Sequence, residues 1–427
     1  MKAIVVDCEI SGERANLKEM ENLLHTLDVD MDFVCSQKLD KPHTATYIGK
    51  GLLNELASYI MQNDVDIVVF NNDLSPLQIK NITEVCGVDV FDRSMIILKI
   101  FEMRASSKEA KLQVEIAYLK YMASRLLEKD KNYEQVTSGG AGGVTNRGAG
   151  EKAIAIKRYL FRKRIKQKEE ELEEIASRRI EKRNSSRKMY PRVASVGYTN
   201  AGKSTLMNNF IRMTDTNKRV EVLEENRLFA TLSTNTRLIK IDKHYPFLLT
   251  DTVGFISSLP TPLIKAFRST LEEINDADLL IHVIDISDPN FIDQIKVTNE
   301  TLREIGINKD IPMIFLLNKI DKISMTNVPF VDDKALLVSL KEEDYMDSIL
   351  SLIDENISKF YVELSLFIPY ENANVFYEIK NNEAIVEYEE NDEGYKCVAK
   401  ISYNNVSKYR DYLALLNNKS KISNKMN

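Results

Sequence analysis

The chain opens with short apolar runs separated by amphipathic stretches, a pattern typical of alternating strands and helices. The apolar runs at residues 3–6, 33–35, 67–70 and 88–91 predict four strands. The stretches 14–27, 51–61 and 75–85 between them have a helical period and predict three helices. Alternation of this kind produces a parallel sheet covered by helices. We therefore predict an N-terminal α/β domain over residues 1–106.

From residue 107 the apolar spacing changes to that of a long helix. Apolar side chains recur at intervals of four and three residues, at Leu112, Ile116, Leu119, Ala123 and Leu126. This spacing forms a coiled-coil-like seam. A glycine-rich run at 138–150 follows, and residues 151–188 are helical in pattern again. The sequence predicts a helical hairpin over residues 107–189 with a glycine-rich tip.

The rest of the chain divides into a second α/β region and a small C-terminal region. Short apolar runs predict strands at 192–196, 239–241, 247–250, 279–284, 313–317 and 336–338, with a helix from residue 205. Runs of this kind are expected in a sheet that is buried on both faces. They predict a Ras-like domain over 190–358. Residues 359–427 predict a small α+β domain, with strands at 364–367, 384–388 and 397–401, helices at 374–379 and 406–416, and a polar tail.

Charge distribution changes the picture of the hairpin. The whole chain has a net charge of −6, but residues 152–188 hold fourteen Lys and Arg against six Asp and Glu. A basic helix on an acidic protein indicates a binding surface for a polyanion, and RNA is the leading candidate. A solvated hairpin without a partner is the alternative. The candidate RNA contacts are Arg147, Gly148, Lys157, Arg158, Arg162, Lys163 and Arg164.

Composition limits the compartment and the kinds of metal site. The four cysteines are far apart and the four histidines lack zinc-site spacing, as expected in a reducing cytosol. The N-terminal apolar run meets Asp7 after four residues, which is too short for a signal peptide. No apolar run approaches the 18 residues of a membrane span. We expect a cytoplasmic protein, with peripheral contact at a membrane left open.

The stretch from Gly197 to Ser204 fits the phosphate-loop pattern, Gly-x4-Gly-Lys-Ser. A predicted strand precedes it and a predicted helix follows, so backbone N–H groups and the helix N-terminus would surround a phosphate chain. Lys203 would reach the β- and γ-phosphates, and Ser204 would ligate Mg²⁺. A turn without a ligand is the alternative. The expected nucleotide contacts are Gly197, Tyr198, Thr199, Asn200, Ala201, Gly202, Lys203, Ser204 and Thr205.

Two downstream segments supply the expected metal and γ-phosphate contacts. Asp251 ends a predicted strand and begins Asp-Thr-Val-Gly, so it would hold Mg²⁺ through water while the Gly254 N–H senses the γ-phosphate. Phe229 and Thr231 lie where a switch segment belongs, and Thr231 is the expected second hydroxyl ligand of Mg²⁺. Thr234 and Thr236 are competitors for that role. Lys203, Thr231 and Gly254 are the expected catalytic residues.

The segment Asn318-Lys319-Ile320-Asp321 follows another predicted strand and indicates the base. The Asp321 carboxylate can accept hydrogen bonds from N1–H and the 2-amino group of guanine, whereas adenine offers no such pair of donors. Asn318 would tie this loop to the phosphate loop, and Lys319 would contribute to the same site. Ser339 and Leu340 begin a weaker candidate for a second base-contacting loop.

Phe255 follows Gly254, at the place where many GTPases carry a glutamine that positions water. We therefore expect slow intrinsic turnover that a partner stimulates.

These residues together resemble the HflX family of translation-factor-related GTPases along nearly the whole chain. The resemblance is carried by Tyr-Ile-Gly-Lys-Gly at 47–51, Leu-Ser-Pro-Leu-Gln at 74–78, Val-Phe-Asp-Arg at 90–93, Glu-Ala-Lys-Leu-Gln-Val-Glu at 109–115, Arg-Gly-Ala-Gly-Glu at 147–151, Asp-Thr-Val-Gly-Phe at 251–255 and Phe-Arg-Ser-Thr-Leu-Glu-Glu at 267–273. Family members usually have proline where this chain has Ala149, and Asp-Pro where it has Ser233-Thr234.

The resemblance implies a Mg²⁺-dependent GTPase that binds the large ribosomal subunit, with the hairpin near the peptidyl-transferase region. It implies dissociation or rescue of ribosomes under stress, and some ATP use beside GTP and GDP. A monomer is expected. The alternatives are a GTP-dependent protein-interaction switch without an RNA partner and a nucleotide or small-molecule kinase. The kinase is disfavoured because Asn318 to Asp321 reads the base and no Arg-rich lid is evident.

Overall fold

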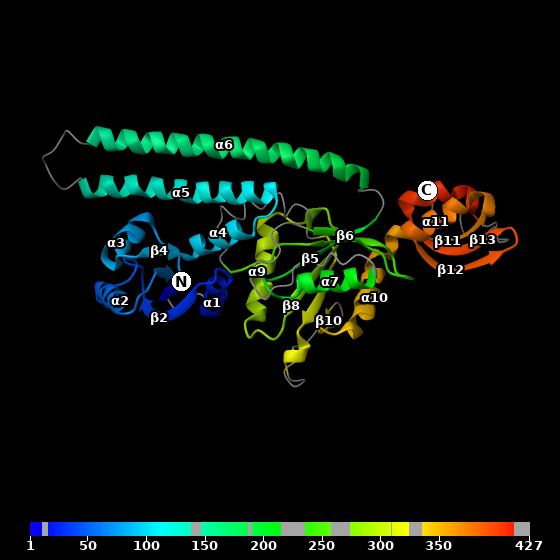
Figure 1. Cartoon of the computed structure of the whole chain (residues 1–427), viewed down its shortest axis with the longest axis horizontal. Helices are drawn as coiled ribbons and strands as arrows, with labels where there is room; N and C mark the ends of the chain where they lie inside the picture. The colour runs from blue at the N-terminus through cyan, green and yellow to red at the C-terminus, as the bar shows by residue number, and fades with distance from the viewer. Residues whose placement is uncertain are drawn as a thin grey trace. The chain divides into compact units, whose positions relative to one another are not determined.

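The computed structural model describes residues 1–10, 16–137, 147–186, 190–214, 235–257, 274–308, 310–323 and 335–413 (Figure 1). The chain forms two compact units. Among the described residues, those up to Arg178 and the segment 255–257 form the first unit, and the others form the second. The predicted α/β class is confirmed, while the division into four domains stays a prediction.

The first unit contains a four-stranded parallel sheet in the order β2-β1-β3-β4. Its strands are β1 (Lys2–Ile10), β2 (Asp30–Leu39), β3 (Ile67–Phe70) and β4 (Asp89–Asp92). The predicted strand at 33–35 is too short, because β2 pairs with β1 over its whole length. It is an edge strand, and most of its side chains are half-buried or exposed. The sequence therefore showed only its short apolar run at 33–35 as a strand.

Four helices cover this sheet: α1 (Leu17–Thr26), α2 (Lys50–Gln62), α3 (Pro76–Cys86) and α4 (Arg93–Arg104). Helix α2 packs against α3, and α1 packs against α4. The start of α3 is fixed by a capping box, in which Ser75 and Gln78 exchange side-chain and backbone hydrogen bonds. Helix α4 was not predicted. It begins where the Asp92 carboxylate accepts a hydrogen bond from the Met95 N–H at 2.9 Å.

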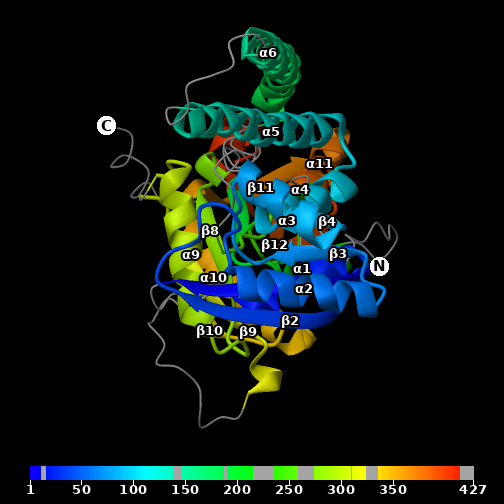
Figure 2. The ribbon, with the colours of Figure 1, turned by 90° about the vertical axis from the view of Figure 1, so that its left-hand side faces the viewer.

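Helices α5 (Lys108–Thr137) and α6 (Arg147–Ser186) lie side by side and antiparallel (Figure 1). Ion pairs join them: Lys108 lies 2.8 Å from Glu171, and Arg164 lies 2.7 Å from Glu115. Helix α5 packs on α3 and α4, as Figure 2 shows. The predicted start of the second helix at residue 151 is wrong, because α6 already begins at Arg147 and takes in the end of the glycine-rich run. Residues 138–146 of the predicted tip lie outside the described residues.

The second unit contains a six-stranded sheet in the order β10-β9-β8-β5-β7-β6. Its strands are β5 (Arg192–Val196), β6 (Asn235–Ile239), β7 (Phe247–Asp251), β8 (Leu279–Asp285), β9 (Met313–Asn318) and β10 (Ala335–Leu337). Among the described strands of this sheet, β6 alone is antiparallel to its neighbour. The predicted strand at 239–241 is wrong, since β6 ends at Ile239. As an edge strand with an exposed Leu238, it lacked the apolar run that marked the others.

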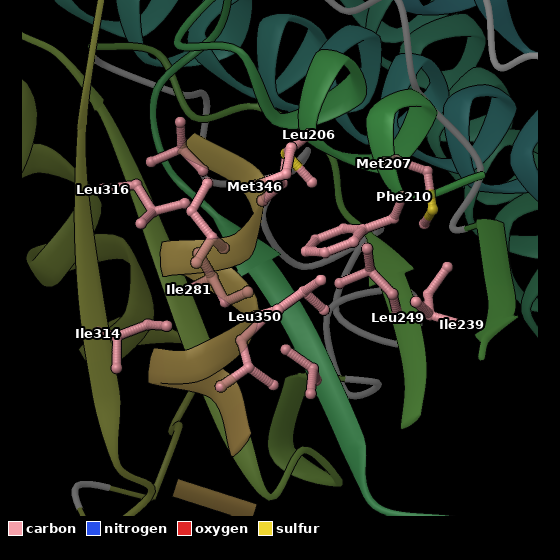
Figure 3. Close-up of a cluster of buried hydrophobic side chains, with 14 of the residues drawn as sticks. Leu206, Met207, Phe210, Ile239, Leu249, Ile281, Ile314, Leu316, Met346 and Leu350 are labelled. Atoms are coloured by element: carbon pink, nitrogen blue, oxygen red, sulfur yellow. The ribbon is translucent and has the colours of Figure 1, made fainter. Parts of the chain in front are cut away.

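Helices α7 (Lys203–Thr214) and α10 (Met346–Ile357) bury one face of this sheet. Phe210 of α7 and Leu350 of α10 meet strand residues such as Ile281 in the core that Figure 3 shows. Helix α9 (Phe291–Glu304) contributes Phe291 to a separate apolar cluster with Ile284 of β8. Neither α9 nor α10 was predicted.

The C-terminal part of the second unit is a three-stranded antiparallel sheet in the order β11-β13-β12. Its elements are β11 (Tyr361–Pro369), α11 (Ala373–Asn382), β12 (Ala384–Asn391) and β13 (Gly394–Ser402). The final helix predicted at 406–416 is wrong. A 3-10 segment, Tyr403–Tyr412, stands there, and Leu413 then bridges back to Leu366 of β11. No helix among the described residues is long and apolar enough to cross a membrane.

Candidate functional site

The phosphate-loop residues connect β5 to the first turn of α7. Both ends are buried, with Val196 closing the strand and Lys203 opening the helix. Gly202 has a φ of +113°, and a Cβ there would lie 2.3 Å from the Asn318 Nδ2. Only glycine fits this conformation and this approach, which leaves the backbone N–H groups of the loop next to the helix N-terminus.

The Lys203 side chain is held over its own loop. Its Nζ donates hydrogen bonds to the carbonyl oxygens of Gly197 at 3.1 Å and Tyr198 at 2.7 Å. Burial lowers the pKa of Lys203 to about 8; the Asp251 charge opposes this shift and the Lys319 charge adds to it. A buried ammonium whose partners are neutral carbonyls is strongly stabilised by a nearby anion, so the loop favours phosphate binding.

Asp251 lies fully buried at the end of β7 and faces the start of α7. Its Oδ2 accepts a hydrogen bond from the Ser204 hydroxyl at 2.9 Å, and its Oδ1 accepts one from the Ser195 hydroxyl at 3.2 Å. The neighbouring Thr252 hydroxyl donates to the Ser195 carbonyl at 2.6 Å. The structure therefore brings together a carboxylate and a hydroxyl, which are the hard oxygen ligands that suit Mg²⁺.

Gly254 lies against the phosphate loop. A Cβ at this position would lie 2.8 Å from the Thr199 Cα and 3.0 Å from the Lys203 Nζ. The backbone after Asp251 thus comes as close to the loop as a residue without a side chain allows. This places Gly254 next to the Lys203 ammonium.

Asn318 joins three segments of the site. Its Nδ2 donates to the Ala201 carbonyl at 2.7 Å, and its Oδ1 accepts from the Leu340 N–H at 3.0 Å. The Leu340 carbonyl in turn accepts from the Asn209 side chain of α7 at 2.8 Å. One buried amide therefore fixes the phosphate loop against the loops that follow β9 and β10.

The residues after Asn318 complete this edge of the sheet. Lys319 has a left-handed backbone with a φ of 69°, and its Nζ donates to the Asn200 carbonyl at 2.8 Å and to Asp285 at 2.6 Å. The Ser339 hydroxyl donates to the Asp321 carboxylate at 3.1 Å. The structure thus brings Ser339 and Asp321 into contact.

Asp285 and His282 lie at the site but were not among the sequence candidates. Asp285 had a usable signal, because it ends the apolar run of β8 at the same carboxyl edge as Asp251 and Asn318. His282 gave none, since it is a single histidine within an apolar strand. Burial lowers the pKa of His282 to about 3, and the Lys203 charge adds to the lowering, so this histidine is neutral at pH 7.

Other candidates lie outside the described part or away from this edge. Phe229 and Thr231, with the competitor Thr234, fall in residues 215–234, which are not described. The other competitor, Thr236, is in β6, with its hydroxyl 2.9 Å from the Thr250 hydroxyl.

The candidate RNA contacts Arg147, Gly148, Lys157, Arg158, Arg162, Lys163 and Arg164 all lie on α6 of the first unit. Lys157, Arg162, Lys163 and Arg164 are exposed, and Arg164 is also paired with Glu115 of α5.

Three family descriptions match consecutive parts of the chain. They are "GTP-binding GTPase N-terminal" at residues 14–102, "GTP-binding GTPase Middle Region" at 104–186 and "50S ribosome-binding GTPase" at 192–319. The GTPase HflX of Caldanaerobacter subterraneus subsp. tengcongensis is 36% identical, over 96% of this chain and 94% of that protein. This chain belongs to the HflX family of GTPases.

Other HflX relatives agree. The GTPase HflX of Alkalihalophilus pseudofirmus is 37% identical over 80% of both chains, and that of Flavobacterium psychrophilum is 40% identical over 71% of this chain and 70% of that protein. A solved structure of SsGBP in complex with GDP is 25% identical, covers 84% of this chain and 99% of that one, and has a TM-score of 0.46. The sequence relatives carry the assignment. As an HflX-family GTPase, the protein binds GTP and GDP and hydrolyses GTP.

Proposed function

We propose that the phosphate loop, Asp251, Gly254 and the Asn318–Asp321 segment form one Mg²⁺-dependent GTP site. Ser204 and Asp251 would hold Mg²⁺, the carboxylate through water, and Thr231 would add the second hydroxyl. The support is geometric, because the Ser204 hydroxyl and the Asp251 carboxylate already lie 2.9 Å apart in a buried setting. Mg²⁺ would supply charge neutralisation on the β- and γ-phosphates.

The protein's own groups have separable tasks in this proposal. Lys203 gains a phosphate partner in place of two neutral carbonyls, and the Gly254 N–H donates to the γ-phosphate. Asp321, with Ser339 beside it, accepts from the guanine N1–H and 2-amino group. ATP use would be secondary, since adenine lacks that pair of donors.

We propose further that the GTP-bound protein binds the large ribosomal subunit and that hydrolysis releases it. The observation that carries this proposal is the pair of exposed basic residues Arg162 and Lys163 on α6, in a chain whose residues 192–319 match a family described as "50S ribosome-binding GTPase". Exposed cations along a helix suit contact with phosphates. The hairpin would reach rRNA near the peptidyl-transferase region.

The cellular task that fits such binding is dissociation or rescue of ribosomes under stress. The protein would act as a monomer in the cytoplasm, with any membrane contact peripheral. Its parts would be an N-terminal domain over 1–106, the hairpin over 107–189, the GTPase domain over 190–358 and a C-terminal domain over 359–427.

Hydrolysis in this proposal depends on the partner. Phe255 takes the place of a water-positioning glutamine, and its side chain is 2% exposed, so it is packed in the protein and offers no polar atom to a water. Slow intrinsic turnover follows, with stimulation on the ribosome.

A protein-interaction switch is the second candidate, and one observation favours it. Ile156, Tyr159 and Leu160 on α6 are exposed large apolar side chains close to the basic residues. Such a surface suits a protein partner as well as stacked bases. The two candidates differ in salt dependence, because phosphate contacts make the logarithm of affinity fall linearly with the logarithm of salt concentration.

The test measures GTP hydrolysis with and without purified large ribosomal subunits at two salt concentrations. We expect salt-sensitive stimulation that the double variant Arg162→Glu/Lys163→Glu loses. The matched control is Lys50→Glu/Lys80→Glu, which makes the same charge change on exposed residues of α2 and α3. If the subunits do not stimulate hydrolysis and GTP-loaded protein does not co-sediment with them, the result would favour the protein-interaction switch.

A further inference from the structure

Asp285 lies at the carboxyl edge of the six-stranded sheet, but it is not among the residues that we assign to Mg²⁺ or to the base. It ends β8 and lies beside Asn318, the last residue of β9. Its Oδ2 is 2.6 Å from the Lys319 Nζ, and the side chains of Asp285 and Lys319 are 16% and 15% exposed. A carboxylate at the edge of a site for an anionic nucleotide disfavours binding through its charge. Charge alone would therefore favour a neutral residue at this position.

The Lys319 ammonium connects Asp285 to the phosphate loop. Its Nζ also donates to the Asn200 carbonyl at 2.8 Å. The Asn200 carbonyl and the Ala201 N–H belong to one planar peptide group, so the direction of the carbonyl fixes that of the N–H. The next carbonyl, that of Ala201, accepts from the Asn318 Nδ2 at 2.7 Å. Asn318 and Lys319 thus hold two successive peptide groups of the phosphate loop.

Both residues of the Lys319–Asn200 contact have a backbone that needs support. The φ angle is 61° at Asn200 and 69° at Lys319, which is the left-handed region. This region is unfavourable for residues with a Cβ and persists where the surrounding contacts determine it. The hydrogen bond between the Lys319 ammonium and the Asn200 carbonyl stabilises both conformations.

A lysine side chain needs a second partner to hold such a carbonyl in place. Its stem is flexible and its ammonium is strongly hydrated, so one neutral carbonyl restrains it weakly. The Asp285 carboxylate supplies a charge-assisted contact. Asp285 is itself restrained, because its Oδ1 accepts from the Ser287 N–H at 3.0 Å and from the Ser287 hydroxyl at 2.6 Å. These bonds leave Oδ2 facing Lys319.

The opposite charges of the pair indicate a geometric task. An unpaired Lys319 would attract phosphate as a cation. The carboxylate 2.6 Å away offsets most of that attraction. What the pair retains is the position of the ammonium against the Asn200 carbonyl.

We propose that Asp285 is a positioning residue for nucleotide binding. It holds the Lys319 ammonium against the Asn200 carbonyl and so keeps the phosphate loop in the conformation that receives the nucleotide. The γ-phosphate takes no part in this contact, so Asp285 serves GDP and GTP alike. The inference rests on the proposed GTP site, because it requires that the phosphate loop contact the nucleotide.

Asp285→Asn tests the proposal, since it keeps the shape of the side chain and removes the charge that holds Lys319. In the full-length protein, stopped-flow release of fluorescent GDP and of a fluorescent non-hydrolysable GTP analogue should both become about tenfold faster. This factor is on the scale of one hydrogen bond to a charged group. Single-turnover hydrolysis of bound GTP should stay within about twofold, because bound phosphates then hold the loop through its N–H groups.

The matched control is Asp293→Asn, which makes the same change in an exposed ion pair with Lys296 on α9. Both release rates should stay within about twofold in this variant, since exposed pairs of this kind contribute little.

Lys319→Met shows whether Asp285 acts through the lysine. This variant removes the ammonium, so Asp285 no longer has a group to position. The double variant Asp285→Asn/Lys319→Met should release GDP no faster than Lys319→Met alone, because two residues that act through one contact are not additive.

Three results would overturn the proposal. Slower release from Asp285→Asn would show that the carboxylate acts on the nucleotide by charge repulsion. An unchanged release rate, or additive effects in the double variant, would show that it does not act through Lys319. A hydrolysis rate that falls as much as release rises would show general damage to the site.

Lys203→Met separates these results from failure of the GTP site itself. If that variant bound GDP as tightly as the unmodified protein, the phosphate loop would not be the nucleotide contact. Loss of GDP binding in Lys203→Met, with unchanged release from Asp285→Asn, would reject the positioning role alone.

Discussion

Replacing Gly254 by alanine tests how closely the chain after Asp251 must approach the phosphate loop. The added Cβ would lie 2.8 Å from the Thr199 Cα and 2.7 Å from its Cγ2. Ordinary carbon contacts are about 3.5–4.0 Å, so the two backbones must separate by about 1 Å. The nearest atom is a flexible side chain, but the Thr199 Cα is backbone and cannot rotate away. A displacement of about 1 Å in a catalytic group costs on the order of a hundredfold in rate.

We therefore expect Gly254→Ala to hydrolyse GTP about a hundredfold more slowly in single-turnover experiments. GDP affinity should stay within about threefold, because the contact that we propose for Gly254 is to the γ-phosphate, which GDP lacks. The control is Gly51→Ala in α2, where a Cβ would meet no atom within 4 Å. A Gly254→Ala rate within threefold of the unmodified protein would refute the reasoning, since the loops would then separate without displacing the N–H.

Three further predictions concern the base, the lysine and the metal. Asp321→Asn loses charge-assisted hydrogen bonds worth about 3 kcal/mol, so competition assays should show an affinity for GTP that is reduced about a hundredfold. Xanthosine triphosphate has a carbonyl at position 2, so the affinity for it should rise relative to that for GTP. Because burial lowers the pKa of Lys203 to about 8, this amine is mostly neutral above that pH and must take up a proton to bind phosphate. Calorimetry of GDP binding at pH 8.5 in two buffers of different ionisation enthalpy should show net proton uptake; no uptake would contradict the assignment. In the unmodified protein, titration with Mg²⁺ should raise the affinity for GTP, and Ser204→Ala should abolish most of this increase. An unchanged increase would show that Ser204 is not a ligand of the metal.

The buried strands of the four-stranded and the six-stranded sheet were predictable from the sequence. Residues 67–70 form a continuous apolar run, and residues 279–284 form one that His282 alone interrupts, because both strands are buried. The edge strands β2 and β6 were misjudged in extent, since exposed side chains interrupt the apolar signal. The helices α4, α9 and α10 were missed although they are regular. For α4 the reason is physical: it is buried on more than one side, so its apolar residues lack a clear helical period.

The local motifs of the site were also predictable from the sequence, because each lies within one short loop. Gly197 to Ser204 is such a loop, and Asp251 and Asn318 each end a buried strand. Parallel strands bring their carboxyl ends to one edge, so the sequence implied that these segments would meet. The contact between Ser339 and Asp321 depends on how two loops fold over that edge, which spacing alone does not determine.

The buried pair of Arg93 and Glu19 shows where sequence reasoning ends. Val-Phe-Asp-Arg at 90–93 was recognised as a family motif, but the motif gave no reason for Arg93. That reason lies in Glu19 and Ser257, which are 238 residues apart in the chain and have no common pattern. Neither partner is unusual by itself: a glutamate in the first turn of a helix reads as a favourable charge, and a serine reads as a turn residue. Only when the fold buries the carboxylate does the charge require a partner. Arg93 and Ser257 then both hydrogen-bond to that carboxylate, and no spacing in the sequence predicts that they do so.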